Sequence, residues 1–199
     1  MCSSDLVRKW KRIDSADGPR FRSSLAAHEA ALLRNLVVSL TGMFDDRESA
    51  APTDELSEIT GIRTGHTTPP DDETMKRLLP DFFRPRNGHP AGSAAAESLN
   101  SALRSLHEPA IIDAKRQAAH RLLDTMPDGG GKFELSEDDA QAWASAVNDV
   151  RLALGAMLEI GPEGLDQLPV GHPMAGHLDV YQWLTVLQEY LVISLMGSR

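Results

Sequence analysis

Cysteine is almost missing from this sequence, because Cys2 is the single one in 199 residues. A disulfide within the chain is therefore excluded, which argues against a disulfide-stapled secreted domain and for a reducing compartment. Long apolar runs are missing too. The most apolar stretch, 180–196, is interrupted by Gln188 and Glu189 and is shorter than the roughly 20 residues that a membrane-spanning helix needs. With no apolar leader after Met1, we expect a cytoplasmic protein without membrane contact.

Catalytic signatures are also absent. His28-Glu29 begins like a zinc-protease motif, but Leu32 occupies the position of the second histidine. The run Gly129–Gly131 lacks the Lys-Ser ending of a phosphate-binding loop. We therefore expect neither catalysis nor a metal or other cofactor. The alternative, an enzyme of unrecognised type, requires a deep pocket that joins groups scattered along the sequence, namely His28, Glu29, His66 and His172.

What the sequence does contain is an ordinary globular composition with an uneven distribution of charge. Apolar residues make up 41% and charged residues 25%, which suits one folded domain, 1–199. The net charge of −9 disfavours nonspecific binding to nucleic acid. Residues 1–22 nevertheless hold six Lys or Arg against three Asp, so this segment carries +3 and the rest of the chain −12. A basic segment on an acidic body is the clearest electrostatic feature.

Residues 1–22 are predicted to form a basic β-hairpin. Side chains alternate along its first half, with Lys11 on one face and Arg12 on the other, and Asp17-Gly18-Pro19 supplies a turn. Residues 132–135 alternate as well and are candidates for a third strand. The hairpin is either a solvated ribbon or a contact surface for DNA phosphates or a partner protein. In the second case the contact residues are Arg8, Lys9, Trp10, Lys11, Arg12, Arg20 and Arg22.

Helical periodicity dominates the body, 24–199, apart from an irregular segment, 45–92. We expect a mostly α fold with a small N-terminal β-hairpin or three-stranded sheet. The last helix, from about Leu178, is apolar nearly all round, which marks either a central buried helix or an oligomer interface such as that of a homodimer. The expected helices are 24–44, 93–107, 109–126, 136–160 and the last one, with short helices at 53–61 and 74–79. Serine is the expected N-cap of three of them: Ser23 or Ser24 for the first, Ser93 for the second and Ser136 for the fourth.

Two charged residues lie on otherwise apolar helix faces, Glu29 and Arg151. If the two helices pack together, these residues form a buried ion pair, and removal of one partner costs about 3–5 kcal/mol. The alternative is that Glu29, close to the start of its helix, accepts a local hydrogen bond. Cys2 is the one candidate for a redox-sensitive thiol, since Arg8 and Lys9 favour its thiolate; the alternative is an inert terminal thiol.

Several segments resemble an actinobacterial family of domains of unknown function, one branch of which is described as oxidative-stress transcriptional regulators. They follow one another along nearly the whole chain. The segments are Trp10-Lys11-Arg12, 27–33, 54–56 with 59–62, 77–82, 148–155 and 181–185.

The resemblance implies redox-linked control of transcription in the cytoplasm. In the described regulators, sensing resembles a two-cysteine switch near the N-terminus. Here Leu6 stands four positions after Cys2, so an intermolecular Cys2–Cys2 disulfide, or no redox sensing, remains. We expect a non-enzymatic, transcription-associated regulator whose partner is the transcription machinery (a sigma factor or polymerase) or DNA. The alternative is a protein-interaction adaptor that never touches DNA.

Overall fold

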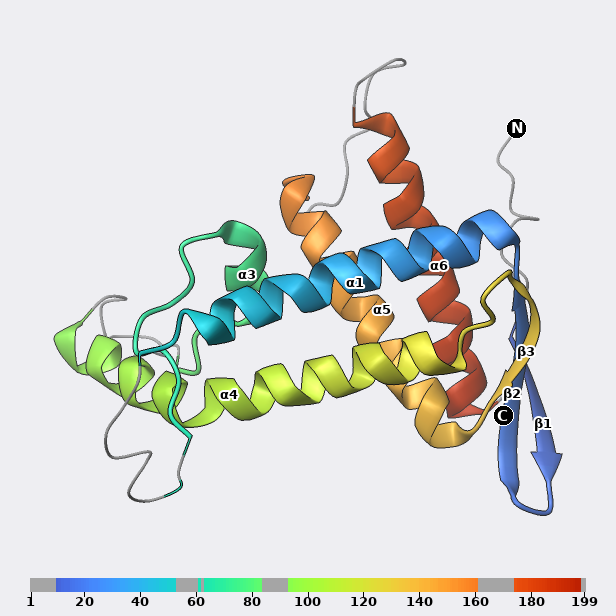
Figure 1. The fold of residues 1–199 in the computed structure, drawn as a ribbon, viewed down its shortest axis with the longest axis horizontal. Helices are drawn as coiled ribbons and strands as arrows, with labels where there is room; N and C mark the ends of the chain where they lie inside the picture. The colour runs from blue at the N-terminus through green and yellow to red at the C-terminus, as the bar shows by residue number, and fades with distance from the viewer. Residues whose placement is uncertain (1–9, 53–60, 62, 84–92, 161–173, 198–199) are drawn as a thin grey trace.

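A computed structural model describes residues 10–52, 61, 63–83, 93–160 and 174–197. This part of the chain is mostly α-helical with one small sheet, which confirms the expected fold class (Figure 1). The strands are β1 Lys11–Ser15, β2 Gly18–Leu25 and β3 Gly131–Leu135. The helices are α1 Ala27–Ser49, α3 Glu73–Leu78, α4 Ala94–Thr125, α5 Glu137–Met157 and α6 Ala175–Met196.

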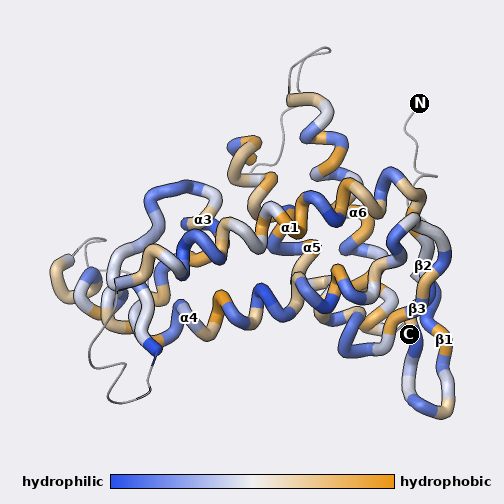
Figure 2. The backbone as a smooth tube through the Cα atoms, viewed as in Figure 1, coloured by the Kyte–Doolittle hydropathy of each residue, from blue (hydrophilic) through white to orange (hydrophobic). Residues whose placement is uncertain are grey.

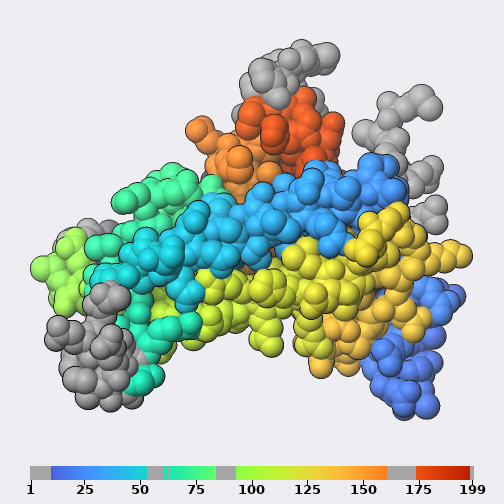
Figure 3. Space-filling model, in the orientation of Figure 1, coloured from blue at the N-terminus to red at the C-terminus, as the bar shows by residue number. Residues whose placement is uncertain are grey.

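Helix α5 is the centre of the fold. It packs against α1, α3, α4 and α6 and against β2 and β3 of the sheet. Helices α1 and α4 lie along each other on one face of the molecule, where Figure 3 shows them as parallel bands. Both change colour repeatedly between hydrophilic and hydrophobic in Figure 2, as expected of helices that bury one side only. One hydrophobic core extends from Trp10 to Leu191.

The sheet has the strand order β1-β2-β3 and is antiparallel throughout. The predicted hairpin and its third strand are therefore both confirmed. Three aromatic rings join the sheet to α5: Phe133 stacks on Trp143 with 5.0 Å between ring centroids, and Trp10 meets both rings edge-on. The Trp143 indole N–H donates to Thr125 Oγ1 at the end of α4 (2.8 Å), so this buried ring keeps its hydrogen bond.

Helix starts follow the expected capping chemistry at α4 and α5. Ser93 accepts a hydrogen bond from the Ala96 N–H, and Ser136 accepts one from the Asp139 N–H. The start of α1 was predicted too early. Ser23 does not cap this helix, because it belongs to β2 and faces Phe133 of β3. The strand conformation is favoured over the helix at Ser23 because Leu25, two residues later, is buried on the same face of the sheet.

The expected Glu29–Arg151 ion pair does not form. The Glu29 carboxylate accepts the Ala26 N–H at 2.6 Å, which is the local alternative, and Arg151 donates to Asn148 on its own helix. A carboxylate in the first helical turn satisfies a backbone donor and faces the positive end of the helix dipole. These two local interactions stabilise the Glu29 carboxylate at the helix end without an ion pair to another helix.

Helix α4 continues through Pro109, which joins the two helices expected on either side of this residue. Proline has no N–H, so the Ser105 carbonyl loses its helical donor. The Gly65 N–H donates to this carbonyl instead, at 2.8 Å. A Cβ on Gly65 would lie 3.0 Å from the Pro109 ring, so glycine is what allows the close approach. The segment around Gly65 is thus held against α4 at the point where Pro109 removes one of the helical hydrogen bonds.

The first half of α4 buries charge and exposes leucine. Arg104 and Glu108 are each 1% exposed, whereas Leu99 is 42% and Leu106 55% exposed. Glu108 binds Arg104 at 2.7 Å and Arg47 of α1 at 2.9 Å, so one carboxylate joins two guanidinium groups. This network, and not Glu29–Arg151, is the buried ion cluster of this part of the fold. It links α1, α4 and the chain around α3, because Arg104 also donates to the Leu79 carbonyl.

A second buried pair connects α4 to α5. Lys115 Nζ lies 2.6 Å from Asp149, whose side chain is 5% exposed. Burial raises the pKa of Asp149, and the Lys115 ammonium acts against this rise without cancelling it. One carboxylate oxygen, Oδ2, has no hydrogen-bond partner. The contact therefore orients the two helices at some electrostatic cost.

Candidate interaction surface

The two faces of the sheet differ sharply in chemistry. Residues that pair directly across strands lie on the same face. Phe21, Leu25 and Leu135 are buried and form the inner face against the helices. The opposite side, which we call the outer face, holds Lys11 opposite Arg22 and Arg22 opposite Glu134. Its residues are Lys11, Ile13, Arg20, Arg22, Ser24, Lys132 and Glu134.

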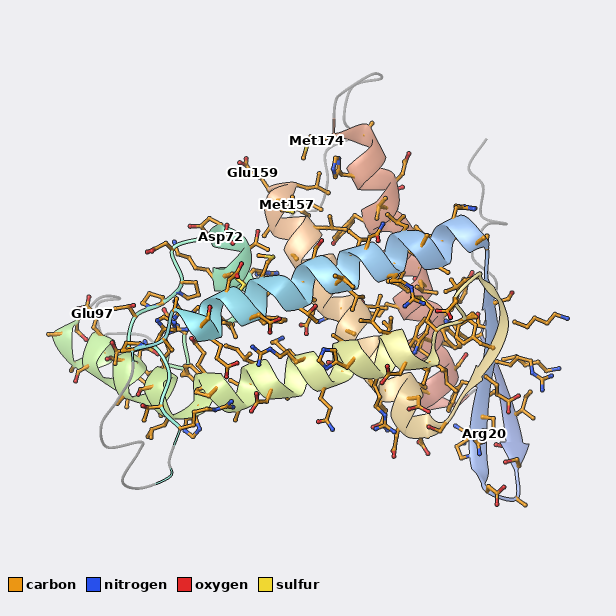
Figure 4. The ribbon with its side chains drawn as sticks, viewed as in Figure 1. Arg20, Asp72, Glu97, Met157, Glu159 and Met174 are labelled. Atoms are coloured by element: carbon orange, nitrogen blue, oxygen red, sulfur yellow. The ribbon has the colours of Figure 1, made fainter. Side chains whose placement is uncertain are left out.

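The outer face carries four cations and one carboxylate. Arg22 binds Glu134 through two guanidinium nitrogens at 2.8 and 3.2 Å, with the two side chains 54% and 40% exposed. Lys11, Arg20 and Lys132 form no ion pair within the described residues. Arg20 is marked in Figure 4 on the hairpin, close to its turn. Three unpaired cations on a small rigid sheet can contact carboxylates or phosphates without first breaking internal bonds.

Arg12 differs from the other basic residues of the hairpin. It pairs with Phe21 on the inner side, with its guanidinium 5.9 Å from the centre of that ring. It also contacts Asp14 at 3.3 Å and reaches the Leu195 carbonyl at the end of α6 at 3.5 Å. A cation at a helix C-terminus is favourable, because the last carbonyls have no intrahelical donor. Arg12 thus holds β1 against α6.

Trp10 was predicted among the contact residues, and the structure corrects this. Its side chain is 6% exposed and lies in the core between Phe133 and Trp143. The hydrophobic gain of burying an indole outweighs its polar N–H, which has no hydrogen-bond partner here. Ser194 of α6 donates to the Trp10 carbonyl and so fixes the backbone at the start of β1.

Sequence reasoning missed one of the four cations of the outer face. Lys132 lies on β3 opposite Ser24, more than a hundred residues away in sequence. Its only signal was the alternation in 132–135, which predicted a strand but not its neighbour. Four predicted site or pocket residues lie outside the described residues: Cys2, Arg8, Lys9 and His172.

Two histidines of the enzyme alternative lie among the described residues, His28 and His66, and they stand near opposite ends of α1. His28 is exposed near the start of α1. His66 contacts the Arg47 carbonyl at 2.6 Å and lines a cavity of about 130 Å³ together with Arg63 and Glu108. Both carboxylate oxygens of Glu108 accept hydrogen bonds from arginines. The cavity therefore lies beside the ion cluster, and its carboxylate is already occupied. Among the described residues, no group of three or more potential metal ligands comes together. None of the described helices has the combination of length and hydropathy that a bilayer span requires.

The fold is a helical domain whose three-stranded sheet has one face in the core and a basic outer face. The chain belongs to the family "Domain of unknown function (DUF2017)", whose model matches residues 7–195. The expected actinobacterial family is thereby confirmed. No solved structure matches the chain.

Mycobacterial relatives cover nearly all of the chain. The protein named oxidative stress regulator AosR of Mycobacterium tuberculosis is 64% identical over 200 residues, which are 99% of this chain and 92% of the relative. The protein of the same name from Mycobacterium bovis has the same identity and coverage. The putative oxidative stress regulator AosR of Mycobacterium leprae is 57% identical over 196 residues, covering 97% and 90% of the two chains.

Proposed function

We propose that this chain is a cytoplasmic, non-enzymatic regulator of the oxidative stress response that acts on transcription by binding a partner through the outer face of the sheet. The names of the mycobacterial relatives support the link to oxidative stress. The observation that carries the binding surface is the gathering of Lys11, Arg20, Arg22 and Lys132 on one side of a sheet whose other side is core.

A protein of the transcription machinery, either a sigma factor or polymerase, is the favoured partner over DNA. The net charge of −9 repels a phosphate backbone at long range. The outer face offers three unpaired cations, whereas a protein whose DNA affinity depends steeply on salt contacts roughly 6–10 phosphates. Ile13, half-buried between Lys11 and Arg20 in this face, adds apolar area of the kind that protein interfaces use.

The proposal is tested by affinity capture from the cytoplasm of the source cells, with and without nuclease. Wild-type chain is compared with Lys11→Glu/Arg20→Glu. The control Lys76→Glu/Arg77→Glu makes the same change of charge on α3, where both residues are exposed. We expect wild type and control to retain polymerase or a sigma factor after nuclease treatment and the outer-face variant to lose it.

Two other outcomes separate the alternatives. Capture that disappears with nuclease identifies DNA as the partner. Captured proteins unrelated to transcription contradict the proposal. So does a captured protein that both charge-reversed variants retain, and either result favours an adaptor that binds elsewhere. Circular dichroism of each variant establishes that the fold is kept, which the exposure of the substituted side chains predicts.

A further inference from the structure

The hairpin leaves one edge of β1 without a neighbouring strand. The strand order β1-β2-β3 places β2 in the middle, so β1 is paired on one side only. Helix α6 contacts the start of β1, where Ser194 donates to the Trp10 carbonyl at 3.3 Å. Beyond this point, in the view of Figure 1, the hairpin runs past the ends of the helices to its turn. An open strand edge of this kind presents backbone N–H and C=O groups to an incoming chain.

The strand register determines which backbone groups of β1 point toward this open edge. Asp14 lies opposite Pro19, which has no N–H, so these two residues cannot exchange a pair of hydrogen bonds. Hydrogen-bonded and non-hydrogen-bonded pairs alternate along an antiparallel ladder. Ile13 therefore directs its backbone groups toward β2, whereas Arg12 and Asp14 direct theirs outward. The Trp10 carbonyl, two residues before Arg12, has this same outward direction and is the one that α6 reaches.

The outward backbone groups of Arg12 and Asp14 have no bonding partner among the described residues. Each residue contributes an N–H donor and a C=O acceptor, at the spacing of an extended strand. An extended chain that lies beside β1 bonds these groups with its own backbone, which is the mode of recognition called strand addition. Main-chain bonds then contribute the affinity, and the side chains beside the edge decide which sequence fits.

The side chains beside the open edge select an acidic sequence. Lys11 and Ile13 border the edge on the outer face, and Arg20 lies opposite Ile13 on β2. Neighbouring strands are about 4.8 Å apart, so an added chain lies about 10 Å from the Arg20 backbone. A glutamate and an arginine side chain together span this distance, and Lys11 is closer still. The edge of β3 is the poorer match, because Glu134 borders it and repels other carboxylates.

We infer that an extended acidic segment of the partner protein adds to β1 as a fourth strand, bonded to the outward backbone groups of Arg12 and Asp14. Carboxylates at every second position of the segment lie on the outer face, beside Lys11 and Arg20. This inference rests on the proposed function and gives the partner of the outer face a defined chemistry. The segment is short, so the buried area lies below that of a standard interface and the complex is weak and reversible.

A synthetic peptide of alternating Glu and Val is the probe for strand addition, because Val favours the extended conformation and all the carboxylates then share one face. The measurement is amide hydrogen exchange of the full wild-type chain, with and without saturating peptide. We expect the peptide to slow exchange at the Arg12 and Asp14 amides by about tenfold or more, since a bonded amide must open before it exchanges.

Two control peptides separate main-chain bonding from charge. The same Glu-Val peptide with alternate N-methyl groups keeps its charge and loses the donors of one edge, and a Lys-Val peptide reverses the charge. Neither is expected to protect the Arg12 and Asp14 amides. A Glu-Val peptide that fails to protect these amides overturns the inference, as does equal protection by the N-methylated peptide.

Asp14→Pro tests the same edge in the affinity capture described above. Proline removes the outward N–H, and strands accept proline where this group faces solvent. Asp14→Asn is the matched control, because it removes the same charge and keeps the N–H. We expect Asp14→Pro to lower the captured amount of the transcription protein by about tenfold or more and Asp14→Asn to retain it. Equal losses in the two variants contradict a main-chain contact.

The charge-reversed variant Lys11→Glu/Arg20→Glu separates failure of this inference from failure of the proposed function. If this variant loses capture while Asp14→Pro retains it, the outer face binds the partner and strand addition is wrong. If both variants retain capture, the proposed function is wrong, and the exchange experiment with the peptides decides strand addition alone. That experiment uses the unsubstituted chain, so its result does not depend on the folding of a variant.

Discussion

The Gly65 N–H donates to the Ser105 carbonyl at 2.8 Å, the acceptor that Pro109 leaves without a helical donor. The backbone N–H of a loop glycine thus replaces the helical donor that proline lacks, across forty residues of sequence. Without this bond, the carbonyl of the half-buried Ser105 would have no donor from the protein, at a cost below the roughly 1–3 kcal/mol of a fully buried group. The bond also fixes the chain between α1 and α3 on the surface of α4.

Gly65→Ala is expected to destabilise the protein by about 1–3 kcal/mol, because the new Cβ would lie 3.0 Å from the rigid Pro109 ring. Gly42→Ala is the control: its Cβ meets nothing within 4 Å inside α1, so a gain of up to about 1 kcal/mol is expected. Urea unfolding measures both. If the clash is the cause, Pro109→Ala partly rescues Gly65→Ala; equal losses with and without the proline would contradict it.

Gly130→Ala is expected to be more damaging, by roughly 3 kcal/mol or more. Gly130 has a φ of +75°, and a Cβ there would lie 2.8 Å from the backbone of Leu25, Ala26 and Ala27. Backbone atoms between β2 and α1 have no rotamer by which to move away. Gly129→Ala, with open space around its Cβ, is the neighbouring control. Similar melting temperatures for the two variants would refute this reading.

Glu108→Gln is expected to cost about 3–5 kcal/mol, since it leaves the buried Arg104 and the mostly buried Arg47 without their shared carboxylate. Glu73→Gln removes a carboxylate that binds Lys76 while 81% exposed, and its effect is expected below about 1 kcal/mol. Chemical denaturation of both variants gives the comparison. A loss of stability in Glu108→Gln no larger than in Glu73→Gln would show that the cluster contributes little.

Acid is expected to remove stability that Asp139 provides. Burial acts to raise the pKa of Asp139, but the Ser136 hydroxyl and Arg121 outweigh burial, so the pKa lies below its ordinary value of 3.8. A carboxyl whose pKa is lower in the folded state stabilises the fold fully above its unfolded pKa. This contribution is lost as pH falls through the folded pKa.

Asp139→Asn is therefore expected to lower the free energy of unfolding by about 1 kcal/mol at neutral pH and by less near pH 3. Urea titrations at the two pH values measure this difference. The exposed Asp128→Asn, whose side chain is fully open to solvent, is the control. A difference for Asp139→Asn that stays constant with pH would exclude the linkage.

Peroxide is expected to oxidise the methionines in order of exposure. Met196 is 79% and Met157 57% exposed, whereas Met75 is 6% and Met126 4% exposed. Figure 4 shows Met157 near the end of α5 that projects beyond α1. Peptide mass spectrometry after brief treatment is expected to find sulfoxide at Met196 and Met157 first. Equal rates at all four would mean that the core opens on the time scale of the reaction.

The sequence by itself determined the elements whose signals are local. Alternation and a turn predicted the hairpin, and the Ser93 and Ser136 caps predicted the starts of α4 and α5. Side-chain hydrogen bonds to the first helical turn and the period of two in a strand act within a few residues, so a sequence contains them in full. The basic character of the outer face was visible for the same reason.

Tertiary structure alone decided which groups meet. Leu99 and Leu106 look like core residues and are exposed, whereas Arg104 looks like a surface residue and is buried. Glu108 pairs with Arg47 of another helix, whereas Glu29 accepts a hydrogen bond from the backbone N–H of Ala26. Lys132 joins the outer face because β3 pairs with β2. These pairings depend on which helix faces pack into the core and on which charged side chains come close together when they do. Both are properties of the packed chain and not of any segment within it.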